Sequence, residues 1–417
     1  MRTWQNMSTV IAVALVLILA IHSDAYPKNR PPEVMSFSRQ VRIHLGERDS
    51  LSVNSSGEII IECYREGKRA ELYYTSSLIK AVRTKDGLMI KDNNGILAIE
   101  LSAVIFKPRF PNVYLDFENK QYKGFIECDD GQAKSPIRVF NMIDIEQYIK
   151  GVLPGEIGDR PETDYEALKA QAIAARTYAI WRLSTQNDGD KHLMNSIDDQ
   201  LYLGYSKELP LLNKAVEETE GVIMTYNGEP IAAYYHAVCG GSTSPVNEVW
   251  DAPASPYLVG IADSNYCQWA KTYNWNETYS IEKLSLNLTD YFAKKNKLPK
   301  KGLGKILSID FIRDDAIGRM VELRIKTTTG EFKVAKDQIR WALKRSNGNG
   351  SILPSTRFNA NVIKSGDTIT KLELIGAGNG HGIGMCQCGA IGRAQNGQTV
   401  EQILNAYYKD IIIERIY

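Results

Sequence analysis

Alternating apolar and polar residues mark the first third of the chain. Runs such as QVRIHL, GEIIIECY and VYLDFENKQYKGFIEC have the two-residue period of a strand with one buried face. Gly, Asn and Asp separate these runs, as in KDNNG. Residues 39–120 are therefore predicted to form a β-rich N-terminal region. The run RVFNMIDIEQYIKGVL then predicts a strand followed by a short helical turn from Asp144 to Lys150.

A helical period replaces this alternation after residue 160. Thr163, followed three residues later by Glu166, fits a capping box that begins a helix. The next apolar positions fall on one narrow stripe and are mostly alanine: Leu168, Ala172, Ala175 and Ala179. Because alanine carries little side-chain bulk, a neighbouring element is expected to pack closely against this stripe.

A different face of the same helix carries two cations. Lys169 and Arg176 lie seven residues apart, about 10.5 Å along the helix axis, and share this face with Glu166 and Ile173. From periodicity alone, the simpler interpretation is a solvated surface.

The rest of the chain mixes strands and helices. The run GVIMTYNGEPIAAYYHAVCGG predicts a hairpin that turns at YNGE. Residues 121–274 and 364–417 are interpreted as two parts of one core, and the more polar residues 275–363 as an inserted α/β subdomain. The last part runs from a strand through a glycine-rich loop into helices. The predicted fold class is α+β.

Composition limits the partners. The 417 residues are 43% hydrophobic and 24% charged, which is ordinary for a soluble globular protein of two or three domains. The formal net charge is only +1, so nothing favours nucleic acid or an anionic membrane surface. A neutral or zwitterionic substrate is the simpler expectation.

The first residues have the features of a secretory signal. Arg2 precedes an apolar run from Val10 to Ile21, and a small residue, Ala25, offers a cleavage site. We predict a signal peptide at 1–25 and a linker at 26–38. The alternative is an uncleaved anchor, which alone would give membrane contact, although the run is short for a bilayer span. Either way a secreted, periplasmic or cell-envelope location is expected.

That location affects how the six cysteines are interpreted. In an oxidising compartment an even number favours disulfides. Cys63 and Cys128 lie in predicted strands and are candidates to pair. A Cys239–Cys267 disulfide is favoured over the alternative of a zinc site, whose soft ligands would come from the following set: His236, Cys239, Cys267, His381, Cys386 and Cys388.

Two stretches carry candidate chemistry. Glu156 stands in LPGEIG, where Pro154 and Gly155 disfavour a regular helix, so a turn is expected to hold its carboxylate. A single glutamate is ordinarily a surface charge, but this one precedes the alanine-rich helix with its cations. His381 lies among the glycines of GNGHGIGMCQCGA, which lacks the context of a dinucleotide-binding loop. A glycine-rich turn with a packing histidine is the alternative there.

Together these stretches resemble the SpoIID/LytB family, named after stage II sporulation protein D and the amidase enhancer LytB. The resemblance covers roughly residues 120–417 in the family's order. It rests on VFNMIDIEQYIKGVLPGEI, EALKAQAIAARTYAI, AAYYHAVCGGST, VWDAPASPYLVGIAD, KDQIRWAL, SILPSTRF and GHGIGMCQCGA. It implies a lytic transglycosylase that cleaves peptidoglycan glycan strands lacking stem peptides, or a non-catalytic enhancer of a cell-wall amidase.

Carried over by position, the family's catalytic glutamate falls on Glu156, and its glycan-holding lysine and arginine on Lys169 and Arg176. The resemblance implies that one acid protonates the glycosidic oxygen and then accepts the C6 hydroxyl proton, whereas ordinary glycosidases use two carboxylates. The pKa of Glu156 should therefore be raised by apolar neighbours, for which the sequence offers Leu153, Pro154 and Ile157. The cations are expected to contact sugar rather than the acid.

Weaker candidates for the lining of the cleft are Tyr235, His236, His381 and Gln387. The chain departs from the family where EIGDRPETDY is longer and lacks a tryptophan, which leaves the wall beside the acid undefined. Some members bind zinc through a Cys/His cluster; the matching stretch here, HLMNSIDDQLYLG, keeps His192 and Gln200 but has no cysteine. No metal or other cofactor is expected. The expected partners are peptidoglycan glycan strands and a cell-wall amidase.

Overall fold

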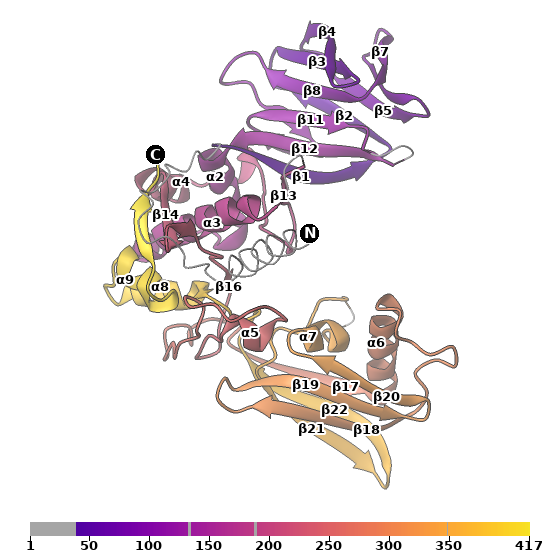
Figure 1. Cartoon of the computed structure of the whole chain (residues 1–417), viewed down its shortest axis with the longest axis vertical. Helices are drawn as coiled ribbons and strands as arrows, with labels where there is room; N and C mark the ends of the chain where they lie inside the picture. Colours follow the sequence, from indigo (N-terminus) through magenta and orange to yellow (C-terminus); the bar gives the residue numbers. More distant parts are fainter. Residues whose placement is uncertain (1–38, 132–134, 187–189, 348) are drawn as a thin grey trace, which may run out of the picture. The chain divides into compact units, whose positions relative to one another are not determined.

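The computed structural model describes residues 39–131, 135–186, 190–347 and 349–417. The predicted signal peptide and linker lie outside these residues. The chain begins with a series of strands and then mixes helices and strands, which confirms an α+β fold with a β-rich N-terminal part (Figure 1). Across the described ranges, no helix is both long and apolar enough to cross a membrane.

The N-terminal region consists of short antiparallel strands in two sheets. Their order is β13-β1-β12-β11-β8-β3-β4 in one sheet and β10-β9-β2-β5-β6-β7 in the other, with β3 and β7 in contact between them. The strands are β1 (Gln40–Arg48), β2 (Ser50–Ser55), β3 (Ile59–Arg65), β4 (Lys68–Thr75), β5 (Ile79–Thr84), β6 (Gly87–Lys91), β7 (Ile96–Leu101), β8 (Ala103–Pro108), β9 (Leu115–Phe117), β10 (Lys120–Tyr122), β11 (Phe125–Asp129) and β12 (Ile137–Asp144), joined by β13 (Leu193–Met194).

The sheet continues beyond residue 120. β12 pairs antiparallel with β1 along its whole length, and Asp144, its last residue, is also the N-cap of the next helix, α2 (Ile145–Glu156). The predicted alternation is present, since Leu51 and Val53 are buried between exposed neighbours in β2. The β-rich region therefore leads into the helical core without an intervening loop.

Cys63 and Cys128 do not pair. Cys63 in β3 and Cys128 in β11 both lie opposite Val104 of β8, which runs between them. Two strand spacings separate their Cα atoms by about 10 Å, beyond the reach of a disulfide. The predicted pairing of these two residues is wrong, and both thiols are buried in the sheet.

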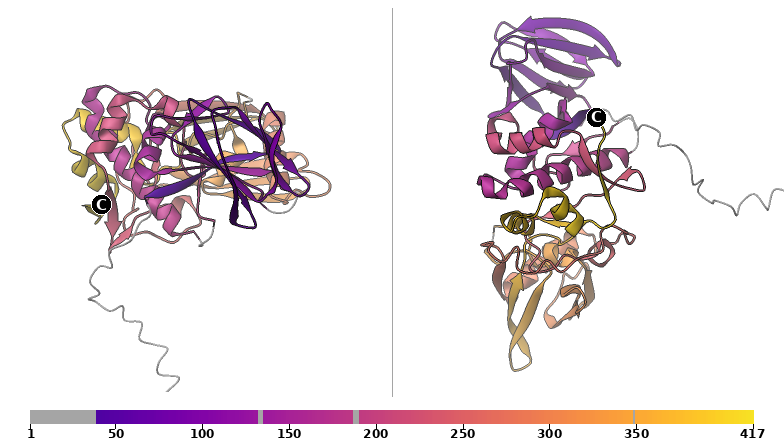
Figure 2. Two further views of the ribbon diagram at one scale, coloured as in Figure 1. Left: turned by 90° about the horizontal axis from the view of Figure 1, so that it is seen from above. Right: turned by 90° about the vertical axis from the view of Figure 1, so that its left-hand side faces the viewer.

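The helical core surrounds α3 (Tyr165–Ser184), which contacts α2, α4, α8, α9 and β14 (Figures 1 and 2). The elements before the insertion are η1 (Glu162–Asp164), η2 (Tyr205–Lys207), α4 (Pro210–Glu218), β14 (Val222–Tyr226), β15 (Glu229–Pro230), β16 (Tyr235–His236) and α5 (Val246–Val249). Those after it are β23 (Met385–Cys386), α8 (Gln387–Gln395), α9 (Val400–Tyr407) and β24 (Ile412–Arg415). β14 and β15 form the predicted hairpin.

α3 is buried on nearly all sides. Of its 20 residues, 13 are buried, including Ile173 and Arg176 on the face that periodicity alone assigns to solvent. A helix packed by neighbours all round needs no polar face, which explains why its alanines are not confined to one stripe. The predicted capping box is also absent: Asp164 is the N-cap, and Glu166 instead accepts the backbone N–H of Val400.

A buried ion pair fixes α3 to α2. Arg176 donates two hydrogen bonds to the carboxylate of Glu146, at 2.7 and 2.6 Å, and its side chain is fully buried. The hydroxyl of Tyr417 and the backbone N–H of Gly221 also donate to Glu146. Both charges are thus satisfied within the core, as a buried pair requires.

The inserted subdomain has its own core. Its elements are β17 (Asn274–Ser280), α6 (Ile281–Lys294), β18 (Ile306–Asp314), β19 (Arg319–Thr327), β20 (Gly330–Ala335), α7 (Gln338–Leu343), β21 (Phe358–Ser365) and β22 (Thr368–Ala377). They form two three-stranded sheets, β17-β22-β21 and β18-β19-β20. The apolar cluster extends from Trp275 to Leu374, so β22 belongs to the insertion, beyond the expected end at residue 363.

Arg176→Met is expected to lower the free energy of unfolding by about 3–5 kcal/mol, because it leaves Glu146 buried without its counter-charge. Lys169→Met, in the same helix, removes a partly exposed pair with Glu166 and should cost less than about 0.5 kcal/mol. Urea unfolding of both variants measures the difference. Equal unfolding midpoints would contradict the structural importance of the buried pair.

Candidate active site around Glu156

Glu156 is the last residue of α2. The predicted turn is wrong, because the helix continues through Pro154 to Glu156. Pro154 lacks the N–H that would bond to the carbonyl of Lys150, and the helix nevertheless continues for two more residues. A Cβ on Gly155 would lie 2.8 Å from the carbonyl oxygen of Leu201, so glycine is needed for the chain to pass this closely. The end of α2 is thus built against the segment 200–203.

This segment fixes the carboxyl group. The backbone N–H of Leu201 donates to Oε1 of Glu156 at 2.8 Å, and the N–H of Leu203 donates to the carbonyl of Gly151 at 3.0 Å. Burial raises the pKa of Glu156 above its usual value, and the Leu201 hydrogen bond opposes part of that rise. Within the ranges that the structure describes, no basic side chain contacts this carboxyl. The direction of the pKa shift is the one expected of an acid that must hold a proton.

Gln387, a predicted lining residue, lies directly beside Glu156. Its side-chain amide donates to the backbone carbonyl of Glu156 at 2.9 Å and to the side-chain oxygen of Gln171 at 3.4 Å. Gln171 lies on α3 and is fully buried, and its own amide nitrogen has no partner in the described part of the chain. The glycine-rich segment, α2 and α3 therefore meet at this point.

Tyr235 lies in a second network beside the acid. Gln200 accepts from the hydroxyl of Tyr148 at 3.1 Å and donates to the hydroxyl of Tyr235 at 2.9 Å. Burial, followed by the charge of the nearby Glu156, raises the pKa of Tyr235 well above its usual value. Tyr235 consequently keeps its proton and does not act as a base, and its hydroxyl oxygen accepts the hydrogen bond from Gln200. Gln200 was recognised in the sequence only as a family position, not as the centre of this network.

The two histidines are not brought to the carboxyl. His236 leaves β16 on the face opposite Tyr235, because successive side chains of a strand alternate, and its Nδ1 contacts the carbonyl of Ile383 at 3.1 Å. His381 accepts the N–H of Ile383 and contacts the carbonyl of Tyr235, while its ring packs on Trp250. Burial lowers the pKa of His381 to about 4. Both rings are neutral and packed against neighbouring backbone, and their place in the lining of the cleft stays a prediction.

Lys169 and Arg176 are also not at the acid. Gln171 faces the Glu156 side of α3; Lys169 lies about 200° and Arg176 about 140° around the helix from it. Lys169 pairs with Glu166 at 2.5 Å and lines a separate hollow with Val400 and Arg415. Arg176 is buried against Glu146. Neither cation shares the face of Glu156. Arg176 is fully buried and cannot contact a glycan, whereas the glycan contact expected of Lys169 stays a prediction.

An exposed tryptophan lies beside the turn after Glu156. Trp269 is 48% exposed and donates from Nε1 to the carbonyl of Cys388, the neighbour of Gln387. The guanidinium of Arg160 lies 5.8 Å from its ring centre, and Arg160 in turn donates to the carbonyl of Ile157. Trp269 also lines a hollow of about 320 Å³ with Tyr266 and Gln395. Sequence reasoning missed this residue, because it lies more than a hundred positions from Glu156 and belongs to no periodic pattern.

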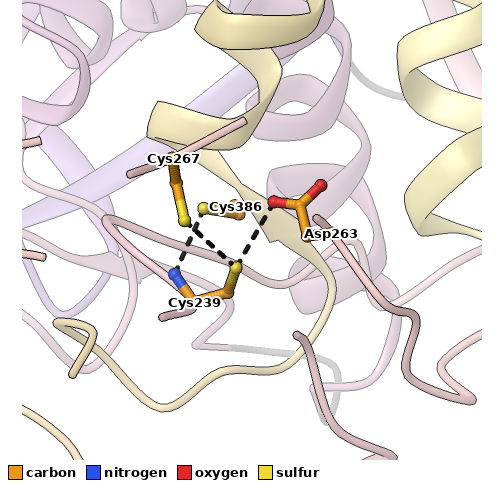
Figure 3. Close-up of side chains that lie close together, drawn as sticks. All are labelled: Cys239, Asp263, Cys267 and Cys386. Carbon is orange, nitrogen blue, oxygen red and sulfur yellow. Dashed lines mark hydrogen bonds between the residues drawn. The ribbon is translucent and has the colours of Figure 1, made fainter. Parts of the chain in front are cut away.

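Three cysteines form a buried cluster near the start of α8. Cys239, Cys267 and Cys386 point toward one another and toward Asp263 (Figure 3). The sulfurs of Cys239 and Cys267 lie 3.5 Å apart as free thiols. Neither His236 nor His381 belongs to this group, so the set of soft ligands named from the sequence is only half correct.

Two family models match parts of this chain. Residues 133–226, which contain Glu156, α3 and Gln200, match the family described as stage II sporulation protein. Residues 265–384, which include the inserted subdomain, match a domain of unknown function. The first match therefore covers the part of the chain that forms most of the candidate site.

Three relatives extend the match over most of the chain. An uncharacterized protein of Brachyspira hyodysenteriae is 30% identical over 348 residues, 82% of this chain and 85% of its own length. The amidase enhancer of Bacillus subtilis is 30% identical over 322 residues, covering 70% of this chain and 44% of its own. Stage II sporulation protein D of the same organism is 28% identical over 289 residues, covering 64% and 73%. The family match and these relatives agree, and the chain belongs to the stage II sporulation protein D family.

Proposed function

We propose that this protein is a peptidoglycan lytic transglycosylase with Glu156 as its general acid and base. Family membership supports a role connected with the bacterial cell wall. The observation that carries the finer proposal is the Glu156 carboxyl itself, which is largely buried, has a raised pKa and is fixed by one backbone donor. The proposal requires a location outside the cytoplasm, as the N-terminal segment leads us to expect.

One carboxyl group suffices for this reaction. The protonated acid donates its proton to the glycosidic oxygen as the bond from C1 of the muramyl residue breaks. The resulting carboxylate then accepts the proton of the C6 hydroxyl of that same residue, whose oxygen bonds to C1. The product carries a 1,6-anhydro ring, and the acid is restored to its protonated form. No second carboxylate is required, in contrast to hydrolytic glycosidases.

The surroundings of Glu156 suit this cycle. Oε1 already accepts the N–H of Leu201, so the transferable proton resides on Oε2. A raised pKa keeps that proton bound nearer to neutral pH, where a general acid is most useful. Tyr235 stays neutral and does not compete with the acid as a base.

For substrate contact, we infer that Trp269 takes the place of the missing family tryptophan. Its exposed ring lies beside the turn that follows Glu156, and aromatic faces suit the apolar faces of uncharged sugars. Arg176 takes no part in substrate contact, because it is fully buried against Glu146.

A non-catalytic role as an amidase enhancer is the competing function. The specific observation in its favour is the name of the Bacillus subtilis relative. In that role the Glu156 region binds glycan without cleaving it, and the partner is a cell-wall amidase. The products formed from glycan strands distinguish the two functions.

Glu156→Gln should reduce the formation of anhydro-muramyl ends at least about 100-fold, since the amide cannot supply a proton. The measurement is mass spectrometry of the fragments released from peptide-free glycan strands. Glu162→Gln, an exposed residue of the nearby η1, is the matched control and should keep full activity. Unchanged products from Glu156→Gln would exclude it as the acid. If the unaltered protein gives no anhydro ends, the enhancer role is favoured instead.

Glu156→Gln should also change the pH dependence of stability. Burial raises the pKa of Glu156 above 4.5, so the folded protein binds this proton more tightly than the unfolded chain does. Its contribution is complete below the unfolded pKa and is lost as pH rises through the folded pKa. The variant should therefore melt at a higher temperature than the unaltered protein near about pH 8 and at a similar one near about pH 4. A constant difference in melting temperature would contradict the raised pKa.

Trp269→Ala should weaken glycan binding several-fold through loss of an aromatic contact surface. The measurement is the KM for glycan strands, or their dissociation constant with the inactive Glu156→Gln protein. Trp341→Ala, which removes a comparably exposed tryptophan from the inserted subdomain, serves as the control and should leave both values unchanged. If the two tryptophan variants behave alike, Trp269 is not part of the glycan site.

A further inference from the structure

The buried group around Cys239 has the composition and spacing of a metal site. Its four potential ligand atoms, three sulfurs and one carboxylate oxygen, lie within 4.8 Å of one another (Figure 3). The sulfur of Cys239 is 3.5 Å from that of Cys267 and 3.3 Å from Oδ2 of Asp263. Sulfurs around a tetrahedral zinc lie about 3.8 Å apart, given Zn–S bonds of about 2.3 Å. Only small movements would bring these ligands to that geometry.

Backbone donors surround the sulfurs. The N–H groups of Cys239 and Gly389 both donate to the sulfur of Cys386, each at 3.2 Å. The N–H groups of Gly240 and Gly241 are directed at the sulfur of Cys267. Such donors stabilise negative charge on sulfur and are typical of the surroundings of metal-bound thiolates.

Hydrogen bonds hold the carboxylate of Asp263 in the way that they hold an oxygen ligand of a metal ion. Oδ1 of Asp263 accepts from Arg393 at 2.9 Å, and the hydroxyl of Tyr407 lies 2.8 Å from Oδ1 and 3.0 Å from Oδ2. Oδ2 also faces the sulfur of Cys239. A Cβ on Gly389 would lie 2.1 Å from Oδ2, so only glycine permits this approach of α8. Outer hydrogen bonds of this kind fix the orientation of a ligand.

Two arginines next to the cluster have no carboxylate partner in the described ranges. Arg319 is buried; it donates to Oγ of Ser244 and to the carbonyl of Cys239, and its Nη1 has no partner among the residues that the structure describes. Arg357, largely buried, donates to Ser242 and to the carbonyl of Ile317. A buried cation is costly unless a negative charge lies close to it.

The charge of the cluster depends on its chemical state. The Asp263 carboxylate contributes −1 in every state and is offset by Arg393. The three cysteines add no charge as thiols, or as a disulfide with one remaining thiol. As three thiolates with Zn²⁺ they add −1, which offsets one of the two unpaired guanidinium groups. The arginines thus favour a metal–thiolate centre over the Cys239–Cys267 disulfide that the sequence favours. Thiolate ligands select zinc over calcium or magnesium.

We propose that Cys239, Cys267, Cys386 and Asp263 bind one structural zinc ion. Binding releases the three thiol protons to solvent and leaves zinc with four protein ligands, a closed site with no position for substrate. The ion would join the loop after β16, the segment 263–267 and the end of β23, whose last residue, Cys386, caps α8. Gln387 follows Cys386 directly, so the zinc would also hold the residue that contacts Glu156. This site differs from the stretch at 192–200 where some family members bind zinc.

The metal content of the purified full chain tests the proposal. Elemental analysis should find one zinc per chain, and Cys386→Ser should lose it. Cys388→Ser, two residues away on the same helix and outside the cluster, is the matched control and should keep it. A zinc-free protein that does not take up added zinc, with a Cys239–Cys267 disulfide in its peptide masses, would overturn the proposal. Equal loss of zinc from both serine variants would overturn it as well.

A second measurement uses the unaltered protein and does not depend on whether a variant folds. Replacement of the bound metal by Co²⁺ should produce sulfur-to-cobalt charge-transfer absorption. X-ray absorption at the zinc edge should show sulfur at about 2.3 Å and a lighter ligand at about 2.0–2.2 Å. A shell of nitrogen and oxygen alone would overturn the assignment. Both readouts are independent of glycan cleavage, so this proposal and the proposed activity can fail separately.

Discussion

The close approach of segment 200–203 to the last turns of α2 is the constraint on which the candidate site depends. Two glycines on α2 make room for it: a Cβ on Gly151 would meet the ring of Tyr202, and one on Gly155 would meet the carbonyl of Leu201. The resulting contact gives Glu156 a backbone donor and removes water from much of its carboxyl. It also places Gln200 between Tyr148 and Tyr235. Without this contact the acid would be an ordinary charge at a helix end.

Some buried charges in the core are paired with an opposite charge, and others are not. Arg176 is neutralised by Glu146, and Arg393 by Asp263, so two of the buried cations have carboxylate partners. Among the described residues, by contrast, Glu156 is largely buried with no cation beside it, and Arg319 and Arg357 have no carboxylate in contact. Here the structure departs from charge balance, and functional sites are where such departures are expected.

The sequence predicted the fold class and the position of the acid, but not most of the residues around it. Two-residue and helical periods report local structure, so the strands and α3 were recognisable. The burial of Arg176 was not, because a helix surrounded by partners and a helix with a solvated face can share the same spacing. Pro154 led to the wrong prediction of a turn, because proline usually disfavours a helix, whereas α2 continues through it to Glu156. Trp269 and Asp263 come from a segment without periodicity, and only the fold brings them to α8 and its neighbours.

The direct passage from β12 into α2 has a structural consequence. Asp144 is both the last residue of the strand and the cap of the helix, so no flexible joint separates the N-terminal sheet from the helix that ends in Glu156. Because Asp144 belongs to both elements, loss of its carboxylate would remove at once the cap that α2 receives at the N–H of Glu146 and the ion pair with Arg39 at the start of the sheet.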